Sequence, residues 1–520
     1  MTQRDSFDSK LHSALDRLNA LDAVKRMVAR DTSLWSDDAS VQSKVHNRLG
    51  WLFHLPEMRQ QLKRLNEFVR LVERRGHDRV VVIGMGGSSL FPEVIARHLR
   101  SKKSLGLQVL DSTHPAALES VRAWAAEGSP LFLVATKSGG TLETLSLYQR
   151  MRAHFPDGAR YVAITDPGSP LVQMAKDEGF LETFLNPADI GGRFSATSLF
   201  GLVPAALTGV DLNVALDAAE QMLEDCSAID AHRNPGAQLA AFLFAAHESQ
   251  RWLLRLSFSR DIEGFAAWVE QLVAESTGKR GQGLLPIPGN TVATDHPSLS
   301  AVAVVGTRTF AHPDDAFVEA CEDRGVPVYD VVMPAKTDLW AEVVRWEVAT
   351  ALVGALLEQN PFDEPDVSAA KAAAQQILSG QSAPRPADRE LVVPSVKALT
   401  KALEPELAEA GADEALAVLA YLPPTESNLH RLSALRDRLQ QNTAATVTVS
   451  VGPRYLHSTG QLHKGGRPAC RFVLLHDHDQ LEACSASPDL AEIIRAQALG
   501  DVMVLKDRGR HVSLARLGGN

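Results

Sequence analysis

Two short loops rich in glycine and hydroxyl side chains are the stretches of the sequence best suited to bind a ligand. Residues 84–89 read GMGGSS and residues 136–141 read TKSGGT. Each loop follows a short apolar run and precedes a helical pattern, which predicts a β-strand joined to the N-terminus of an α-helix. Glycines let a ligand approach the backbone, and free N–H groups at a helix N-terminus stabilise an anion by about 0.3–2 kcal/mol. The two loops therefore predict a site for a small phosphorylated molecule.

The order of residues argues against two other kinds of phosphate loop. A dinucleotide fingerprint needs a third spaced glycine, and Ser89 stands at that place in the first loop. A nucleoside-triphosphate loop places its lysine after the glycines, whereas Lys137 precedes Gly139 and Gly140 in the second loop. The remaining alternative is that both loops are simple turns and helix caps. Their equivalent places after two parallel strands favour a shared ligand site, because ligands of such sheets bind at the carboxyl edge.

The elements that must position these loops alternate between strand and helix patterns. Residues 1–75 read as helical. Strands are expected at 79–84, 109–111, 131–135 and 161–165, then at 253–259, 301–306 and 326–333, and a buried helix at 341–357. Three later runs also read as strands: 446–452, 470–477 and 501–507. This alternation predicts βαβ units and parallel sheets, and thus an α/β fold.

A chain of 520 residues is too long for one ordinary core, so several domains are expected. A Ser/Pro-rich break at residues 379–390 separates the last α/β portion from the rest. We expect a helical N-terminal segment at 1–75, a first parallel-sheet domain with both loops at 76–210, a second at 211–380, and a C-terminal α/β extension at 381–520.

Composition points to a cytoplasmic enzyme. The net charge of −10 and the pI of about 6.0 argue against a nucleic-acid partner. No C-x-x-C pair occurs among the cysteines, so neither a metal site nor a disulfide framework is expected from Cys226, Cys321, Cys470 and Cys484. The charged N-terminus does not read as a signal peptide, and no apolar run reaches the roughly 18 residues of a membrane span.

Five motifs, in order along the chain, resemble the sugar-isomerase (SIS) domain family and, more narrowly, the glucose-6-phosphate isomerases. They are IGMGGSS, ATKSGGTLET, GGRFSATSLFGL at 191–202, AESTGKRGQGLLPI at 274–287 and NPFDEPDVSAAK at 360–371. The resemblance spans about residues 45–375 and implies two flavodoxin-like SIS domains. Three other strings, VARDTSLW, NRLGWL and YLHSTGQLHKGG, resemble the isomerase half of bifunctional transaldolase–isomerase proteins. No transaldolase barrel is expected within these residues.

The resemblance assigns three groups to the chemistry of aldose–ketose isomerisation, which needs a base, a stabiliser for the enediolate and groups that open the sugar ring. Glu275 matches the proton-transfer base, Arg193 the arginine beside the enediolate, and Lys371 the lysine that contacts the ring oxygen. The residues before Glu275 read as a buried helix with Gly278 suited to its C-terminal cap, whereas Glu270 reads as solvent-facing.

The phosphate ligands implied by the resemblance lie in the two loops and in the helix start that follows. They are Ser88, Thr136, Lys137, Ser138, Thr141 and Thr144, with Gly86 and Gly87 as a substrate loop. The hydroxyls at positions 138, 141 and 144 have the spacing of neighbours around a helix start.

The ring-opening histidine departs from the family pattern, because Cys321 stands where short bacterial relatives carry a histidine. A neutral thiol is a poor substitute for imidazole near neutral pH. His457 is the preferred replacement, contributed across subunits or within the chain, and His463 and His312 are alternatives. His463 is followed by residues that fit a surface turn, which makes it the weaker of the two in its string.

The sequence therefore predicts reversible isomerisation of D-glucose 6-phosphate and D-fructose 6-phosphate through an enediol, without metal or organic cofactor. The resemblance also implies a homodimer, and a separate transaldolase is a candidate partner. Two alternatives stay open: an isomerase that also accepts mannose 6-phosphate, and a SIS-domain sugar-phosphate sensor without catalysis. The departure at Cys321 supports the sensor, whereas the presence of Glu275, Arg193 and Lys371 opposes it.

Overall fold

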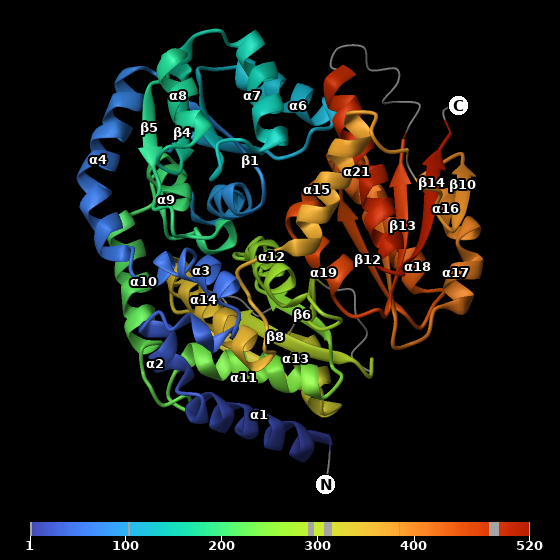
Figure 1. Cartoon of the computed structure of the whole chain (residues 1–520). Coiled ribbons are helices and arrows are strands. Elements are labelled where there is room, and N and C mark those ends of the chain that lie inside the picture. The colour runs from blue at the N-terminus through green and yellow to red at the C-terminus, as the bar shows by residue number, and fades with distance from the viewer. Residues whose placement is uncertain are drawn as a thin grey trace.

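The computed structural model describes residues 3–101, 104–289, 296–305, 315–383, 385–477 and 488–518, which are organised around three sheets (Figure 1). The chain begins with helices that lie on the outside of the first two sheets: α1 (Gln3–Ala20), α2 (Ala23–Val28), α3 (Ala39–His46) and α4 (Leu55–Arg74). This helical segment is tied to the first sheet-containing part, because the Gly50 N–H donates to the Asp189 carbonyl at 2.9 Å. The expected helical N-terminus is confirmed.

The first sheet has five parallel strands in the order β2-β1-β3-β4-β5, which is the flavodoxin-like order. Its strands are β1 (Arg79–Gly84), β2 (Gly106–Leu110), β3 (Pro130–Ala135), β4 (Tyr161–Thr165) and β5 (Glu182–Leu185). Its helices are α5 (Leu90–Val94), α6 (Pro115–Ala126), α7 (Leu142–His154), α8 (Pro170–Asp177) and α9 (Leu199–Leu207). Four of these strands agree with the sequence patterns, and β5 was not predicted.

Alternation along β1 explains why both faces of this sheet are covered. Val81 and Ile83 pack in a core cluster with residues of α6, α7 and α8, whereas Val80 and Val82 pack in the main core with residues of α4 and α9. Side chains of a strand point alternately to the two faces, so an uninterrupted apolar run needs cover on both. The continuous run at residues 80–83 is therefore the signature of a buried parallel strand.

The second sheet has four parallel strands in the order β7-β6-β8-β9. They are β6 (Leu253–Phe258), β7 (Leu285–Pro288), β8 (Leu299–Val305) and β9 (Val328–Val332). Its helices are α10 (Leu212–Asp225), α11 (Pro235–Glu248), α12 (Phe265–Thr277), α13 (Asp315–Asp323) and α14 (Leu339–Leu356). Nearly every residue of α14 is buried, which confirms the buried helix expected there. β7, with prolines at two of its four positions, was not predicted.

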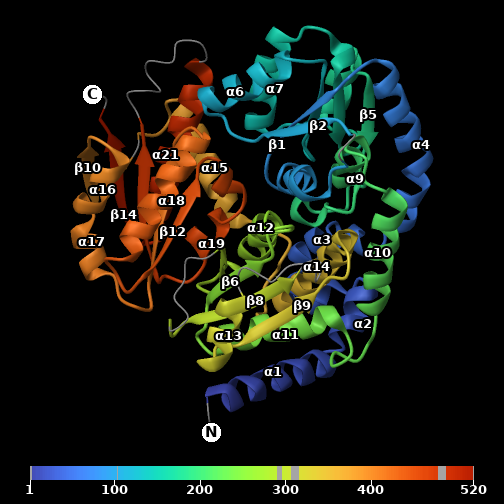
Figure 2. The ribbon, with the colours of Figure 1, turned by 180° about the vertical axis from the view of Figure 1, so that it is seen from behind.

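The third sheet has five parallel strands in the order β10-β14-β13-β11-β12 and lies beside the other two sheets in both views (Figures 1 and 2). Its strands are β10 (Arg389–Val393), β11 (Ala415–Tyr421), β12 (Thr446–Val451), β13 (Cys470–His476) and β14 (His511–Leu517). We call these strands and the helices between them the third-sheet unit: α16 (Val396–Ala402), α17 (Glu404–Glu409), α18 (Glu426–Gln440), α19 (Gly460–Gly465) and α21 (Pro488–Asp507). Helix α15 (Pro365–Leu378) precedes this unit and packs along α21.

The prediction of a strand at residues 501–507 is wrong, because these residues form the last two turns of α21. Gly500 lies so close to α15 that a Cβ there would come within 2.8 Å of the Ala374 backbone nitrogen. Val504 packs against Ala370 and Ala373 of the same helix. Contact between two helices, which is a tertiary effect, therefore decides the structure of this short apolar run.

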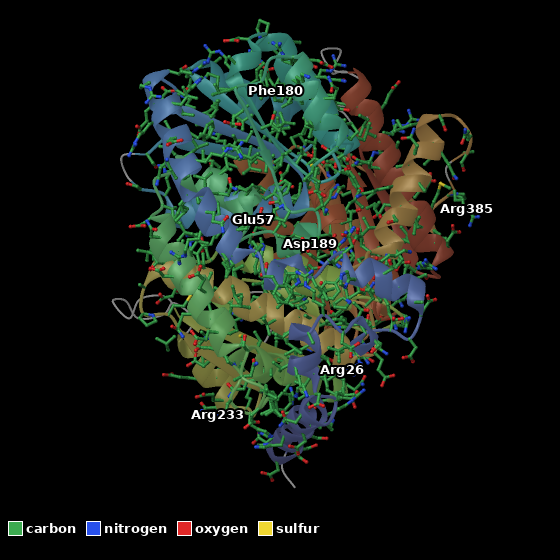
Figure 3. All side chains as sticks on the ribbon, turned by 60° about the vertical axis from the view of Figure 1, so that its left-hand side comes forward. Arg26, Glu57, Phe180, Asp189, Arg233 and Arg385 are labelled. Atoms are coloured by element: carbon green, nitrogen blue, oxygen red, sulfur yellow. The ribbon has the colours of Figure 1, made fainter. Side chains whose placement is uncertain are left out.

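The fold class is confirmed as α/β with parallel sheets, a helical N-terminal segment and a C-terminal α/β region. Within the parts of the chain that the structure describes, no helix is both long and apolar enough to span a bilayer. Charged side chains such as Arg385 project at the periphery of the molecule (Figure 3). The residue boundaries expected for the domains remain predictions.

Candidate active site

The two loops predicted to bind a ligand begin side by side at the carboxyl edge of the first sheet, because Gly84 of β1 is in register with Ala135 of β3. The first loop is pressed against a third segment of the chain. A Cβ added at Gly87 would overlap the carbonyl oxygen of Gly192, so only glycine allows this approach. The contact places Arg193, the next residue, beside the first loop.

The second loop forms a small cradle of hydroxyl groups in front of α7. The hydroxyls of Thr136 and Thr141 are 2.8 Å apart, and the hydroxyl of Ser138 accepts a hydrogen bond from the Gly140 N–H at 3.2 Å. Thr141 occupies the N-cap of α7 without capping it through its side chain. Thr144 is fully buried, and its hydroxyl has no hydrogen-bond partner among the described residues. The cradle thus has hydroxyl groups and backbone N–H groups to offer to an anion.

Two of the expected phosphate ligands, Lys137 and Ser88, differ from the cradle hydroxyls in their surroundings. The ammonium group of Lys137 pairs with Asp166 and donates to the carbonyl of Ala188 at 2.7 Å, so it is already committed within the protein. Ser88 is buried in the tight turn of the first loop. The cradle hydroxyls are therefore better placed for an incoming phosphate than the Lys137 ammonium is.

Glu275 lies in the last turn of α12 and is only 6% exposed. Burial raises the pKa of Glu275 to about 8, with Arg193 lowering the pKa and Glu364 raising it. The nearest guanidinium nitrogen of Arg193 is 3.5 Å from the Glu275 carboxylate, and Gln271 lies one helical turn earlier with its amide nitrogen also 3.5 Å away. A buried carboxyl whose pKa is near 8 can exchange a proton at neutral to mildly basic pH.

Arg193 is held by contacts on every side of its guanidinium. It donates to the Ser276 hydroxyl at 2.8 Å, to the Glu364 carboxylate at 3.0 Å, and to the carbonyls of Pro361 and Asp363 at 2.7 and 3.0 Å. The side chain is 6% exposed. A fixed cation beside a buried carboxyl is suited to stabilise a developing negative oxygen, because it needs no reorganisation when the charge forms.

His457 enters this region from the third-sheet unit of the same chain. It ends the short 3-10 turn Arg454–His457, and its Nε2 is 3.0 Å from the Glu143 carboxylate of α7. The Gln271 amide donates to the His457 carbonyl at 2.7 Å, and Gln497 donates to Glu143 at 2.7 Å. Burial opposes ionisation of Glu143, but hydrogen bonding and charge interaction with His457 outweigh it and lower the pKa of Glu143 to about 2. His457 and Glu143 are thus brought together within one chain.

Lys371, on α15, joins the cradle and the histidine around one cavity of about 320 Å³. Four of the residues predicted from the sequence line this cavity: Ser138, Thr141, Lys371 and His457. Glu143 and Gln497, which were not predicted, line it as well. Glu275 and Arg193 are not among its lining residues. Lys371 nevertheless lowers the pKa values of both Glu143 and Glu275, so it lies within electrostatic reach of both groups. Segments distant in sequence therefore converge on one place.

The expectation of a surface turn after His463 is wrong. His463 is buried in α19 between the rings of Tyr455 and Phe472, with centroids 5.8 and 5.3 Å away. Burial lowers the pKa of His463 to about 3, which leaves the ring neutral. The following Lys464 is fully buried and pairs with Asp501. His463 thus packs in the third-sheet unit and is absent from the residues that line the candidate cavity.

Three other expectations can be compared with the structure. Glu270 is partly buried, and burial raises its pKa to about 7, so its description as solvent-facing is wrong. Cys321 is buried and does not line the cavity, and burial raises its pKa to about 11. Gly278 does end α12, but with a negative φ. Its small size matters instead, because a Cβ there would overlap the backbone of Leu462 in α19. His312 lies outside the described residues.

Sequence reasoning missed four polar side chains that complete the arrangement: Glu143, Gln271, Glu364 and Gln497. Gln271 could have been found, because it precedes Glu275 by four residues and so lies on the same face of the helix. Glu143 could also have been suspected, as a carboxylate in the first turn of the helix that follows the cradle. Gln497 belongs to α21, and no local pattern connects it with the cradle.

The parallel sheets, the flavodoxin-like strand order of the first sheet and the hydroxyl-rich loop at its carboxyl edge define an α/β protein. Two solved structures share the fold. "Hypothetical protein TT0462" from Thermus thermophilus aligns with a TM-score of 0.60 and 23% identity over 72% of this chain and 98% of its own. A glucose-6-phosphate isomerase from Chlamydia trachomatis aligns with a TM-score of 0.57 and 18% identity over 71% of this chain and 86% of its own.

Sequence comparison places the chain more narrowly. The family model "Phosphoglucose isomerase" matches residues 52–284 of the chain. A glucose-6-phosphate isomerase of Synechococcus sp. (strain JA-2-3B'a(2-13)) is 29% identical over 63% of this chain and 73% of its own length. The enzyme of Nostoc punctiforme is 30% identical over 58% and 66%, and that of Synechococcus sp. (strain CC9902) is 32% identical over 58% and 65%. The matches thus span roughly two thirds of the relatives' length.

Proposed function

We propose that this chain catalyses the reversible isomerisation of D-glucose 6-phosphate and D-fructose 6-phosphate. The observation that carries the proposal is the convergence of the cradle, Lys371 and His457 on one cavity. Gln271 contacts both the His457 carbonyl and Glu275, and Arg193 lies 3.5 Å from Glu275. The relationship to the phosphoglucose isomerase family supports the same reaction. A sugar-phosphate sensor would have no use for a buried carboxyl held beside a fixed guanidinium.

Binding begins at the cradle. The hydroxyls of Ser138, Thr141 and Thr144, with the backbone N–H groups at the start of α7, receive the phosphate. This anchors the sugar over the cavity that His457 and Lys371 line. His457 takes the proton of the C1 hydroxyl while Lys371 gives a proton to the ring oxygen, which opens the ring. Glu143 orients the imidazole and stabilises its protonated form through the 3.0 Å contact.

Proton transfer then takes place on the open chain. Glu275, as the carboxylate, removes the C2 proton of the aldose, the hydroxyl proton passes from O2 to O1 in the enediolate, and the Glu275 carboxyl then gives its proton to C1. The carbonyl has moved from C1 to C2, and Glu275 ends as a carboxylate. Arg193 stabilises the enediolate oxygen that carries the negative charge between the two transfers. The reverse direction uses the same groups in the opposite order. No step in this scheme requires a metal or an organic cofactor.

The experiment that tests the proposal compares Glu275→Gln with Glu270→Gln, an equivalent change in a partly buried glutamate of the same helix. Turnover of fructose 6-phosphate is followed by oxidation of the glucose 6-phosphate formed. Glu275→Gln is expected to lower kcat about 10²–10⁴-fold with a small change in KM, because an amide cannot accept the proton. Glu270→Gln is expected to stay within a few-fold of the parent. Near-normal turnover by Glu275→Gln would remove it as the base, and equal losses in both variants would indicate general disruption of α12.

Three properties follow from the family resemblance and belong to the same proposal. The protein acts in the cytoplasm, it forms a homodimer, and any transaldolase that shares its substrates is a separate protein. The arrangement of His457 and Glu143 within one chain supports a site that a single subunit can complete, so the dimer would serve stability more than chemistry.

A further inference from the structure

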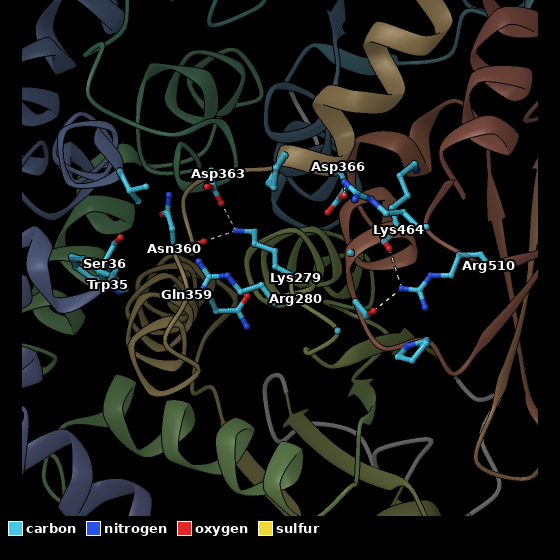
Figure 4. A pocket seen from close by; sticks show the side chains of 17 residues that line it. Trp35, Ser36, Lys279, Arg280, Gln359, Asn360, Asp363, Asp366, Lys464 and Arg510 are labelled. Carbon is cyan, nitrogen blue, oxygen red and sulfur yellow. Dashed lines mark hydrogen bonds and ion pairs between the residues drawn. The ribbon is translucent and has the colours of Figure 1, made fainter. Parts of the chain in front are cut away.

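A second and larger cavity, of about 540 Å³, lies where three parts of the chain meet: the N-terminal segment, the third-sheet unit, and the second sheet with its helices α10–α14, which we call the second-sheet part (Figure 4). Trp35 and Ser36 line it on one side, and Lys464 and Arg510 line it on the other. None of its lining residues belongs to the cradle, and neither Glu275 nor His457 is among them. Lys464 is in the wall between the two cavities. This volume lies within the range of sites that hold small metabolites.

The lining of this cavity is rich in cations. Its charged residues are Lys279, Arg280, Lys464, Arg508 and Arg510, against the carboxylates Asp363 and Asp366. Three of the cations already have carboxylate partners: Lys279 pairs with Asp363 at 2.8 Å, Arg508 with Asp366 at 2.5 Å, and Lys464 with Asp501 outside the cavity lining. The other two cations of the lining are Arg280 and Arg510. Neither makes an ion pair with a carboxylate among the described residues.

Arg510 is the stronger indication of an anion site, because it is only 6% exposed. Its guanidinium donates to the carbonyls of Arg467, Lys464 and Gly466 at 2.9, 3.0 and 2.5 Å, and its Nε has no hydrogen-bond partner in the described part of the chain. Carbonyl oxygens satisfy N–H groups but do not neutralise a charge. Burial lowers the pKa of Arg510, and Asp366, the carboxylate that raises it, already pairs with Arg508. A buried cation that shares its countercharge carries an electrostatic cost that a bound anion would reduce.

Arg280 is held on the opposite side of the cavity by an unusual turn (Figure 4). Its φ of +53° lies in the left-handed region, which costs a non-glycine residue free energy. It donates to the Glu358 carbonyl at 3.2 Å, and the neighbouring Gly281 N–H donates to the Gly465 carbonyl of α19 at 2.9 Å. The turn thus joins the second-sheet part to the third-sheet unit while it presents a guanidinium to the cavity.

We infer that this cavity is a second anion site, which binds a small phosphate-bearing molecule between Arg280 and Arg510. Guanidinium groups pair with phosphate through parallel charge-assisted hydrogen bonds, and Arg280 and Arg510 retain N–H groups for this purpose. Two unpaired arginines on opposite walls fit a ligand with more than one anionic group. Binding here is independent of the cradle, although the consequence for turnover rests on the proposed function.

The consequence follows from Lys279, which also lines the second cavity. Its ammonium group donates to the Asn360 carbonyl and pairs with Asp363, and the carbonyls of Pro361 and Asp363 hold Arg193. An anion beside Lys279 competes with Asp363 for its charge and so acts on the segment that positions Arg193. Occupancy is therefore expected to change turnover while the affinity of the cradle for phosphate stays the same.

Titration calorimetry of the full chain with pyrophosphate tests the inference. The parent is expected to bind two pyrophosphate molecules per chain, one in the cradle and one in the second cavity. Arg280→Gln removes an exposed arginine and should weaken only the second site, by about tenfold or more. Thr141→Val should weaken only the first. Arg436→Gln, a change in an arginine of α18 that pairs with Asp437, is the matched control and should alter neither site.

Two results would overturn the inference: a single bound pyrophosphate that Thr141→Val abolishes, or equal weakening by Arg280→Gln and Arg436→Gln, which would indicate unspecific attraction to surface charge. A different result separates this inference from the proposed function. If Thr141→Val leaves both binding events unchanged while Arg280→Gln removes one, the second site stands and the cradle assignment fails.

Discussion

Glu275 combines deep burial with one cation and one anion at close range, and this balance makes its protonation sensitive to single substitutions. Burial raises the pKa of Glu275 to about 8, Arg193 lowers it, and Glu364 raises it. The carboxylate, which is the form that acts as a base, is therefore populated as the pH rises through about 8. At neutral pH most of the free protein carries the protonated form.

This balance predicts the pH dependence of the reaction. The value of kcat/KM for fructose 6-phosphate should rise with pH along a limb centred near 8. Glu364→Gln removes a negative neighbour, so the limb should move to lower pH even if the maximal rate falls through the loss of a contact to Arg193. Glu358→Gln, at an exposed residue that pairs with Arg17, should leave the limb in place. A limb unmoved by Glu364→Gln would show that another group controls it.

The role proposed for His457 predicts that its substitution slows ring opening much more than proton transfer. His457→Asn should slow the cyclic sugar phosphate about 10²–10⁴-fold, whereas an open-chain substrate analogue should be affected much less. Glu143→Gln should give a weaker version of the same pattern, because it removes the partner that orients the imidazole. His463→Asn is a poor control, since His463 is buried between two aromatic rings. Equal losses of His457→Asn on cyclic and open-chain substrates would contradict the assignment.

At the residue scale, the sequence identified the groups that carry a motif and missed those that depend on packing. Lys371 and His457 could be named, and the structure brings them to one cavity with the cradle. Gln497 could not be named, because its contact with Glu143 joins α21 to α7 across two parts of the chain. No spacing in the sequence encodes that contact. The roles of all these residues stay predictions.

In the first loop, a close backbone contact between two segments positions a side chain that is distant in sequence. Gly87→Ala should push the Gly192 carbonyl away and shift Arg193 with it, because the added Cβ overlaps that oxygen. A shift of about 1 Å at a catalytic group can lower kcat/KM by about 10²-fold. Gly192→Ala is the matched control from the other side of the contact, since its Cβ meets no atom within 4 Å. Equal activity of the two variants would show that this contact does not position Arg193.

Not every strand of the third-sheet unit could be predicted from the pattern of apolar and polar residues. β11 reads ALAVLAY and was missed, because alanine and leucine favour helices and no polar residue alternates with them. Ala417 and Leu419 pack on the α21 side of the sheet, whereas Leu416 and Val418 pack on the α16–α18 side, so the strand is apolar throughout. Short, fully buried runs are ambiguous between strand and helix until their neighbours are known.

The whole molecule depends on a charged junction where its three sheet-containing parts meet. Arg454 of the third-sheet unit pairs with Glu93 and, at 3.5 Å, with Asp111 of the first-sheet part. It also lowers the pKa of Glu270 on α12 of the second-sheet part. Burial opposes the charge of Arg454, but Asp111 and Glu93 raise its pKa overall. Because Arg454 begins the turn that ends at His457, this junction also sets the position of the histidine.

We expect the substitution of Arg454 to lower both stability and activity. Arg454→Met leaves Asp111 without its ion-pair partner and Glu93 with Arg97 alone, and the free energy of unfolding should fall by about 1–3 kcal/mol. Turnover should fall at temperatures where the variant is still folded, because the turn that carries His457 loses its anchor. Arg436→Met, in the same unit, should change neither quantity by much. Denaturant titration beside the activity assay measures both, and an Arg454→Met protein as active as the parent would refute the anchoring role.

The order of strands in the third sheet has a consequence for protein synthesis. β14 (residues 511–517) lies between β10 and β13, so this sheet has a gap until those residues have left the ribosome. The first two sheets, with Glu275 and Arg193, can fold earlier, since domains fold as units from the N-terminus. The third sheet, whose unit carries His457, is therefore completed after the other two sheets. Until then the edges of β10 and β13 are open to wrong pairing. A nascent chain therefore holds Glu275 and Arg193 in place before His457 joins them.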